Sequence, residues 1–193
     1  DCDKLIERRV STGDNDILLG TRNGKSIRFS EEQIRPSGRK TMGVKGITLS
    51  SEDDRLVGML LIKREGTTVL VATEKGFGKR TEISQYRAQK RGGKGVLTMK
   101  TTEKVGKMVT IKEVVDKDDL MIITNQGVLI RQPVAQIRAI GRATQGVKLI
   151  KLGEGTLVSS ITRIMTEEEG DEDGAPEETE NENSNPKTEE ATS

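Results

Sequence analysis

Short apolar runs recur at regular intervals along this chain of 193 residues. They span Asp16–Thr21, Val69–Thr73 and Leu120–Thr124. Each run has the length and the aliphatic composition of a buried β-strand. A glycine stands three residues after the end of each run, and glycine tolerates the positive φ of a tight turn. A second strand is predicted after each turn, so each run opens a β-hairpin.

The hairpins belong to a sequence repeat. Aligned on Gly24, Gly76 and Gly127, the copies are offset by 52 and 51 residues. Each copy is expected to continue through a basic loop into a third and a fourth strand, at Val44–Leu49 and Leu56–Ile62, at Val96–Lys100 and Lys107–Val115, and at Val147–Leu152 and Leu157–Ile164. Four short strands in a unit of about fifty residues are typical of a propeller blade. The only helical element that the pattern predicts is one turn at Ser30–Ile34.

The repeat predicts an all-β, propeller-like fold with three four-stranded blades, at about residues 12–65, 66–116 and 117–165. Lys4–Ser11 is predicted to be a single remnant strand of a preceding unit. Propellers close with roughly four to eight blades, and three blades leave open strand edges. The chain also begins with Asp rather than Met. We therefore expect residues 1–165 to be part of a larger ring.

Positive charges keep the register of the repeat. Arginines recur four, eleven and fifteen residues after the aligned glycine, and another glycine recurs nineteen residues after it. Such repetition offers the same cationic surface on each unit, which favours a polyanion bound along its length, and duplex DNA in particular. The predicted DNA contacts are Arg28, Arg80 and Arg131 in the second strands, and Arg35, Arg39, Lys40, Arg87, Arg138 and Arg142 in the basic loops. The strand arginines are expected on the solvent face, where an ordinary exposed residue is the alternative interpretation.

The middle loop is the richest in charge and in glycine. It holds three cations and three glycines in seven residues, and the whole run is predicted to contact DNA: Gln89, Lys90, Arg91, Gly92, Gly93, Lys94 and Gly95. Glycines let a phosphate backbone approach the main chain, and exposed N–H groups in a glycine turn bind anions. The run is not a nucleotide P-loop, because it lacks the G-x-x-x-x-G-K-[ST] pattern. A flexible surface loop with incidental charge is the alternative, and the arginines of the two aligned loops argue against it.

The remaining chemistry is sparse. The chain has no histidine and one cysteine, Cys2, which excludes the usual zinc sites, an internal disulfide and the Ser–His and Cys–His nucleophile pairs. We therefore predict neither a catalytic nor a metal site, and a single cysteine fits a reducing cytosol. Tyr86, the only tyrosine, aligns with Ile34 and Ile137 and is interpreted as a packing residue. No apolar run reaches the length of a membrane span.

The charge is unevenly distributed along the chain. Residues 166–193 hold 12 acidic residues and one basic residue, a net charge of −11, whereas the rest of the chain has a net charge of +12. This acidic tail contains almost no apolar side chains, so it is predicted to be disordered. Two roles are open for it: competition with DNA for the basic surface, and solubility alone.

The run Gln89–Gly95 resembles the glutamine–basic–arginine–glycine–glycine–basic–glycine box of the DNA gyrase A-subunit family. Asn23–Phe29 and Gly141–Val147 resemble the C-terminal blades of that family, over residues 4–165, and an acidic tail is also typical of it. The resemblance implies a β-pinwheel, a propeller-like disc whose basic rim bends and wraps duplex DNA in support of ATP-dependent negative supercoiling. The order of the repeats before the tail resembles the last blades, so Gln89–Gly95 is either a second box or the principal one.

The resemblance also implies partners and cofactors. The partners are duplex DNA, a gyrase B subunit and a second gyrase A subunit in a heterotetramer, in the bacterial cytoplasm at the nucleoid. The holoenzyme uses ATP and Mg²⁺, but its catalytic tyrosine and its ATPase belong to other domains, so no cofactor is expected in this part. The related A-type subunit of topoisomerase IV is one alternative, and a non-catalytic propeller scaffold that binds acidic proteins is another.

Removal of residues 166–193 is expected to tighten DNA binding if the tail competes for the basic surface. Loss of eleven net negative charges should raise the affinity for duplex DNA on the order of tenfold at low salt, and by less as salt screens the charges. Fluorescence anisotropy with a labelled duplex, across a salt series, measures the change. Equal affinities of the two chains at low salt would leave solubility as the role of the tail.

Overall fold

The computed structural model describes residues 4–63 and 66–165, and these residues are all-β, as predicted. The acidic tail predicted to be disordered lies outside the described residues. A 3-10 turn, η1 (Glu31–Gln33), begins at Ser30, whose hydroxyl accepts a hydrogen bond from the Glu32 N–H at 3.2 Å. The helical turn predicted at Ser30–Ile34 is therefore confirmed. Within the described residues, no helix is long and apolar enough to cross a membrane.

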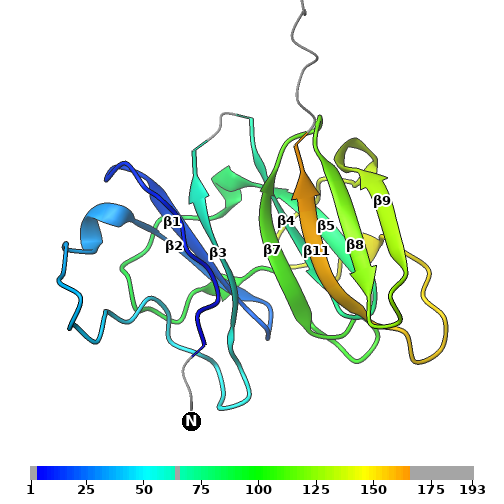
Figure 1. Cartoon of the computed structure of the whole chain (residues 1–193), viewed down its shortest axis with the longest axis horizontal. Coiled ribbons are helices and arrows are strands. Elements are labelled where there is room, and N and C mark those ends of the chain that lie inside the picture. The colour runs from blue at the N-terminus through cyan, green and yellow to red at the C-terminus, as the bar shows by residue number, and fades with distance from the viewer. Residues whose placement is uncertain (1–3, 64–65, 166–193) are drawn as a thin grey trace, which may run out of the picture.

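Three antiparallel sheets make up the described part of the chain (Figure 1). Their strand orders are β3–β1–β2–β6, β10–β5–β4–β7 and β11–β8–β9. The predicted hairpins are confirmed: Leu18 lies opposite Arg28, and Leu70 lies opposite Arg80. The strands are β1 (Asp16–Thr21), β2 (Lys25–Ser30), β3 (Leu56–Ile62), β4 (Thr68–Thr73), β5 (Phe77–Glu82), β6 (Val96–Leu97), β7 (Met108–Val114), β8 (Asp119–Thr124), β9 (Leu129–Pro133), β10 (Val147–Lys148) and β11 (Val158–Ile164), and two further 3-10 turns are η2 (Ile83–Gln85) and η3 (Val134–Gln136).

The fourth strand of a sheet comes from the following repeat. β6 follows the second basic loop in the sequence but pairs with β2 of the first hairpin, and β10 of the third repeat pairs with β5 of the second. The expectation that each repeat supplies all four strands of its own blade is therefore wrong. A strand needs an edge on which to pair its backbone groups, and the basic loop carries the chain to the edge of the neighbouring hairpin. The segment expected as a strand at Val44–Leu49 forms none in the described chain.

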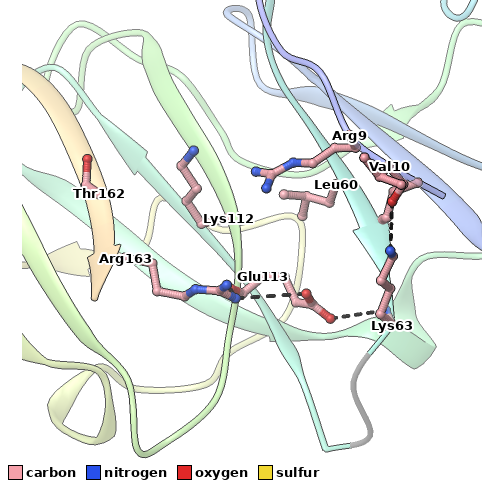
Figure 2. A pocket seen from close by; sticks show the side chains of 9 residues that line it. Arg9, Val10, Leu60, Lys63, Lys112, Glu113, Thr162 and Arg163 are labelled. Atoms are coloured by element: carbon pink, nitrogen blue, oxygen red, sulfur yellow. Dashed lines mark hydrogen bonds and ion pairs between the residues drawn. The ribbon is translucent and has the colours of Figure 1, made fainter. Parts of the chain in front are cut away.

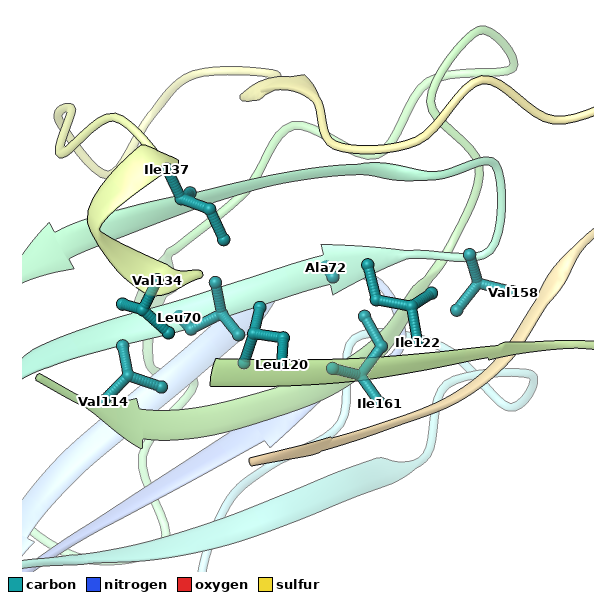
Figure 3. Close-up of a cluster of buried hydrophobic side chains, with 9 residues drawn as sticks. All are labelled: Leu70, Ala72, Val114, Leu120, Ile122, Val134, Ile137, Val158 and Ile161. Atoms are coloured by element: carbon teal, nitrogen blue, oxygen red, sulfur yellow. The ribbon is translucent and has the colours of Figure 1, made fainter. Parts of the chain in front are cut away.

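Neighbouring blades share hydrophobic cores. β3 contacts β7, and β7 contacts β11, so the inner strands of successive blades are adjacent. Burying an aliphatic side chain stabilises a fold by about 1.5–3 kcal/mol, so a shared core fixes one blade against the next. Tyr86 is 1% exposed in the core between the first and second repeats, which confirms its interpretation as a packing residue. The core between the second and third sheets comprises Leu70, Ala72, Val114, Leu120, Ile122, Val134, Ile137, Val158 and Ile161 (Figure 3).

Residues 4–11 form no strand, contrary to the prediction of a remnant strand at Lys4–Ser11. The segment passes close to the end of β3, where Lys63 Nζ donates to the Val10 carbonyl oxygen at 2.8 Å. A side-chain donor holds the segment at this point. A strand requires a run of paired backbone groups, which these residues do not make.

A substitution at Gly95 should disrupt the pairing of β6 with β2. Gly95 has a φ of +68°, and a Cβ there would lie 2.4 Å from the Ser26 carbonyl oxygen in β2. Gly43 occupies the same repeat position, with a φ of +74° and no atom within 4 Å of such a Cβ. Gly43→Ala is expected to cost about 1–2 kcal/mol from its backbone conformation alone, and Gly95→Ala about 1–3 kcal/mol more from the clash. Urea unfolding measures the difference, and equal costs would contradict the strand exchange.

Candidate nucleic-acid interface

The second and third basic loops lie along the outer strand of the preceding repeat. In the second loop, the Gln89 N–H donates to the Arg28 carbonyl oxygen at 2.8 Å, and Ala88 forms a bridge with Arg28. In the third loop, the Ile140 N–H donates to the Arg80 carbonyl oxygen at 2.9 Å. β2 and β5 are separated from the inner strands β3 and β7 by one strand of the same sheet. Both loops therefore lie at the outer edge of the blades.

Seven of the predicted cations are exposed and form no ion pair among the described residues. A cation without a carboxylate partner keeps its charge available for an anionic ligand, and an exposed one loses little hydration when it binds. They are therefore the strongest candidates for phosphate contacts. They are Arg35, Arg39, Lys40, Arg87, Lys90, Lys94 and Arg138.

Two further loop arginines are half-buried and also bind the protein backbone. Arg91 Nη1 donates to the Lys45 carbonyl oxygen at 2.6 Å. Arg142, one repeat later, donates from Nη1 to the Leu97 carbonyl oxygen at 3.0 Å, and its guanidinium carbon lies 6.0 Å from the centre of the Tyr86 ring. These contacts hold each guanidinium against the preceding repeat. Their charges are therefore preorganised at the outer edge.

The expectation that the strand arginines face solvent is wrong for Arg80, and Arg28 is largely covered, with a side chain that is 22% exposed. Arg28 Nη1 donates to the carbonyl oxygens of Ile83 at 3.2 Å and Tyr86 at 3.1 Å, in the 3-10 turn of the next repeat. Arg80, 8% exposed, makes the equivalent bond from Nε to the Ile137 carbonyl oxygen at 2.7 Å. The carbonyl groups at the end of each 3-10 turn need donors. The arginine of the preceding strand supplies them.

Arg131 differs from these two arginines. Its side chain is 60% exposed, and its Nε donates to Asp119 Oδ2 at 2.7 Å. Arg28 binds Asp16 in the same way, from Nε to Oδ2 at 2.8 Å. An aspartate twelve residues before the arginine therefore marks a diagonal cross-strand ion pair. The spacing is a sequence signal for these two pairs only, because Arg80 pairs with Asp116 without it.

The glycines of the second loop serve contacts between chain segments. The Gly92 N–H, expected to be free for an anion, donates instead to the Gly46 carbonyl oxygen at 2.8 Å. The Gly93 carbonyl oxygen accepts from the Thr48 N–H, also at 2.8 Å. These backbone groups are therefore bonded to the preceding repeat. The charge that a ligand would meet at this loop comes from its side chains.

A pocket of about 500 Å³ lies between the inner strands (Figure 2). Its cations have acidic neighbours: Arg163 Nη1 lies 4.0 Å from Glu113 Oε2, and Lys112 Nζ lies 3.9 Å from Glu7 Oε2. The Lys63 N–H also donates to Glu113 Oε1 at 3.3 Å. Because Arg163 and Lys112 have acidic neighbours, this pocket is a weaker anion site than the outer loops. The described part of the chain contains no group of three or more His, Cys, Asp or Glu that could hold a metal ion.

The family described as DNA gyrase C-terminal domain, beta-propeller, matches residues 15–63, 67–114 and 118–164, which correspond to the three repeats. The DNA gyrase A subunit of Staphylococcus epidermidis (strain ATCC 12228 / FDA PCI 1200) is 48% identical over 168 residues, 86% of this chain and 19% of the relative. The DNA gyrase A subunit of Staphylococcus aureus (strain MRSA252) is 47% identical over 176 residues, 91% of this chain and 20% of the relative. The chain thus spans about a fifth of the length of these relatives.

Two solved structures share the fold. The crystal structure of the C-terminal domain of DNA topoisomerase IV has a TM-score of 0.76 and 24% identity, over 81% of this chain and 49% of that chain. The structure of the DNA gyrase A C-terminal domain has a TM-score of 0.72 and 25% identity, over 79% of this chain and 51% of that chain. Both confirm the propeller-like all-β fold. The chain spans about half of each solved domain.

Replacing Arg80 is expected to weaken the fold more than replacing Arg131. Arg80→Met removes a buried donor and leaves the Ile137 carbonyl oxygen without its bond, which costs about 1–3 kcal/mol. Arg131→Met, at the same repeat position, removes an exposed ion pair worth less than about 1 kcal/mol. Urea unfolding measures both free energies. Equal losses would show that Arg80 is not a donor that stabilises the junction between the second and third repeats.

Proposed function

The chain belongs to the family of DNA gyrase C-terminal domains, and we propose that it binds duplex DNA along the outer edge of its blades and bends it. One observation carries the proposal: equivalent loops of successive repeats present exposed cations that no carboxylate of the described chain pairs. The blades lie side by side and share cores, so a bound polyanion would meet these loops in succession (Figure 1).

The energetics favour binding of the DNA backbone over reading of its sequence. Each cation that neutralises a phosphate releases condensed counterions, which supplies affinity without base specificity. Smooth bending of roughly 20–30 base pairs costs on the order of 1–6 kcal/mol, and contacts spread over three loops offset this cost. Arg91 and Arg142 hold their loops against the preceding repeat, so the charges keep their places while the DNA bends.

In the complete protein, this bending would support ATP-dependent negative supercoiling by a holoenzyme with a gyrase B subunit and a second gyrase A subunit. The holoenzyme would use ATP and Mg²⁺ in its other domains, in the cytoplasm at the nucleoid. The identity to gyrase A subunits over most of this chain supports this role. The alternative is a role in topoisomerase IV, whose C-terminal domain has the same fold. The run Gln89–Gly95 favours gyrase.

Neutralising the second loop is expected to weaken DNA binding and to lower its salt dependence. Lys90→Gln with Lys94→Gln removes two exposed charges, so the slope of log affinity against log salt should fall in magnitude by about 2. The charge-matched control is Lys75→Gln with Lys104→Gln. Lys75 precedes β5 and the second loop follows it, so Lys75 lies at the opposite end of that strand from the loop. Anisotropy with a labelled duplex measures both slopes. Equal slopes for the two variants would contradict binding at the outer loops.

Bending is tested separately from binding. Nicked plasmid is ligated in the presence of the chain, and its linking number is compared with that of plasmid ligated alone. A shift that grows with protein concentration is expected if the blades curve the DNA. Tight binding with no shift would mean that the outer loops hold DNA straight, which would contradict wrapping. Weak binding with no shift would favour the scaffold alternative.

A further inference from the structure

Lys79 in β5 is a fully buried lysine beneath the third basic loop. Its Nζ donates to the carbonyl oxygens of Gly141, at 2.6 Å, and of Arg142, and to Thr144 Oγ1 at 3.1 Å. Among the described residues, this ammonium forms no ion pair with a carboxylate. A buried charge is strongly unfavourable unless hydrogen bonds compensate it. Here three oxygens of a single loop compensate it.

Comparison between repeats shows that a blade does not require this lysine. The aligned residue in β2 is Ile27, also fully buried, and Gly93 of the second loop lies against it. In that repeat, Thr48 Oγ1 donates to the Gly92 carbonyl oxygen at 2.6 Å. The residue aligned with Thr48 in the second repeat is Lys100, so the third loop receives no hydroxyl bond from this position. The third loop is instead bound by Lys79, whose ammonium donates to the carbonyl oxygens of Gly141 and Arg142.

We propose that Lys79 is a positioning residue for DNA binding, which holds the third basic loop so that Arg142 is directed to the DNA backbone; this rests on the function proposed above. The ammonium binds three of the four residues from Gly141 to Thr144. The Arg142 guanidinium in turn donates to the Leu97 carbonyl oxygen at 3.0 Å. A shift of the loop backbone therefore moves this guanidinium away from its place at the outer edge.

The hydrogen bonds from Lys79 Nζ to the third loop depend on the protonation of this amine. Burial, and after it the positive charge of Arg142, lowers the pKa of Lys79 to about 8. Arg142 is the charged group that acts on the ammonium, and the oxygens bonded to it are uncharged. A neutral amine has two N–H donors for three acceptors and loses the attraction between its charge and the carbonyl dipoles. The third loop should therefore loosen between about pH 7 and pH 9.

Unfolding would not account for a loss of binding in this pH range. The folded-state pKa of Lys79, about 8, lies below the ordinary value of 10.5. Between these values the unfolded chain binds more protons than the folded chain, so the contribution of Lys79 to stability rises with pH. As the pH rises, the contribution of Lys79 to the free energy of unfolding increases, while the third loop loses a hydrogen bond from Lys79. Loop release and unfolding are therefore distinguishable.

DNA affinity at two pH values tests the proposal. The unsubstituted chain should lose affinity about three- to tenfold from about pH 7 to about pH 9 at constant salt. Lys79→Met should bind weakly at both values, without this pH dependence. Ile27→Met, at the aligned position of the first repeat, is the matched control and should keep the affinity and the pH dependence. Arg142→Ala keeps Lys79 and should also lose the pH dependence, which covers the case in which Lys79→Met does not fold.

Hydrogen exchange of residues 138–146 provides a measurement that does not involve DNA. Relative to residues 86–95, the third loop should lose protection between the two pH values in the unsubstituted chain, and should be poorly protected at both in Lys79→Met. Equal protection in both chains at both values would overturn the role of Lys79. A loop that responds to pH in a chain that binds no DNA would instead support the grip of Lys79 and overturn the proposed function.

Discussion

The exchange of a strand between neighbouring repeats is the constraint on which the rest of the structure depends. β6 and β10 complete sheets that begin in the preceding repeat, so each of their basic loops has to cross the outer edge of its neighbour. The strand edge it covers is paired and closed to other chains. The same crossing brings the 3-10 turn of one repeat over an arginine of the repeat before, as at Arg28 and Arg80. The contacts that build the fold are thus the contacts that place the candidate interface.

A charge that recurs with the repeat is not by itself a ligand contact. Arg80 and Arg138 both recur, yet Arg80 is 8% exposed and bonded to a carbonyl oxygen, whereas Arg138 is exposed. The difference is whether the neighbouring backbone has acceptors that need a donor. A buried carbonyl group left without a donor costs about 1–3 kcal/mol. An arginine that lies against a 3-10 turn therefore donates to the carbonyl groups at the end of that turn. The exposed loop cations, among them Arg138, Lys90 and Lys94, form no ion pair among the described residues.

Local patterns are sufficient to predict the hairpins, the 3-10 turn after Ser30 and the packing role of Tyr86. Each follows from residues close in the sequence or from alignment of the repeats. The partner of β6 is not predictable in this way, because a strand pattern does not distinguish an edge in its own repeat from an edge in the next. The burial of Lys79 is not predictable from the sequence either, because its acceptors lie 62 to 65 residues away. By contrast, Lys94 is in a glycine-rich loop, and its exposure follows from the sequence alone.

A bent duplex makes a mechanical demand on the loops that hold it. Its elastic energy is released if a loop yields, so a loop must be held in place to keep the curve. The second loop is held by uncharged groups, among them Thr48 and Gly46, and by the guanidinium of Arg91, which donates to the Lys45 carbonyl oxygen. The third is held by the Ile140 N–H and the Arg142 guanidinium and also by the buried ammonium of Lys79, whose hydrogen bonds weaken when it loses its proton. Of these two loops, the third is the one whose support includes a side chain with a pKa of about 8.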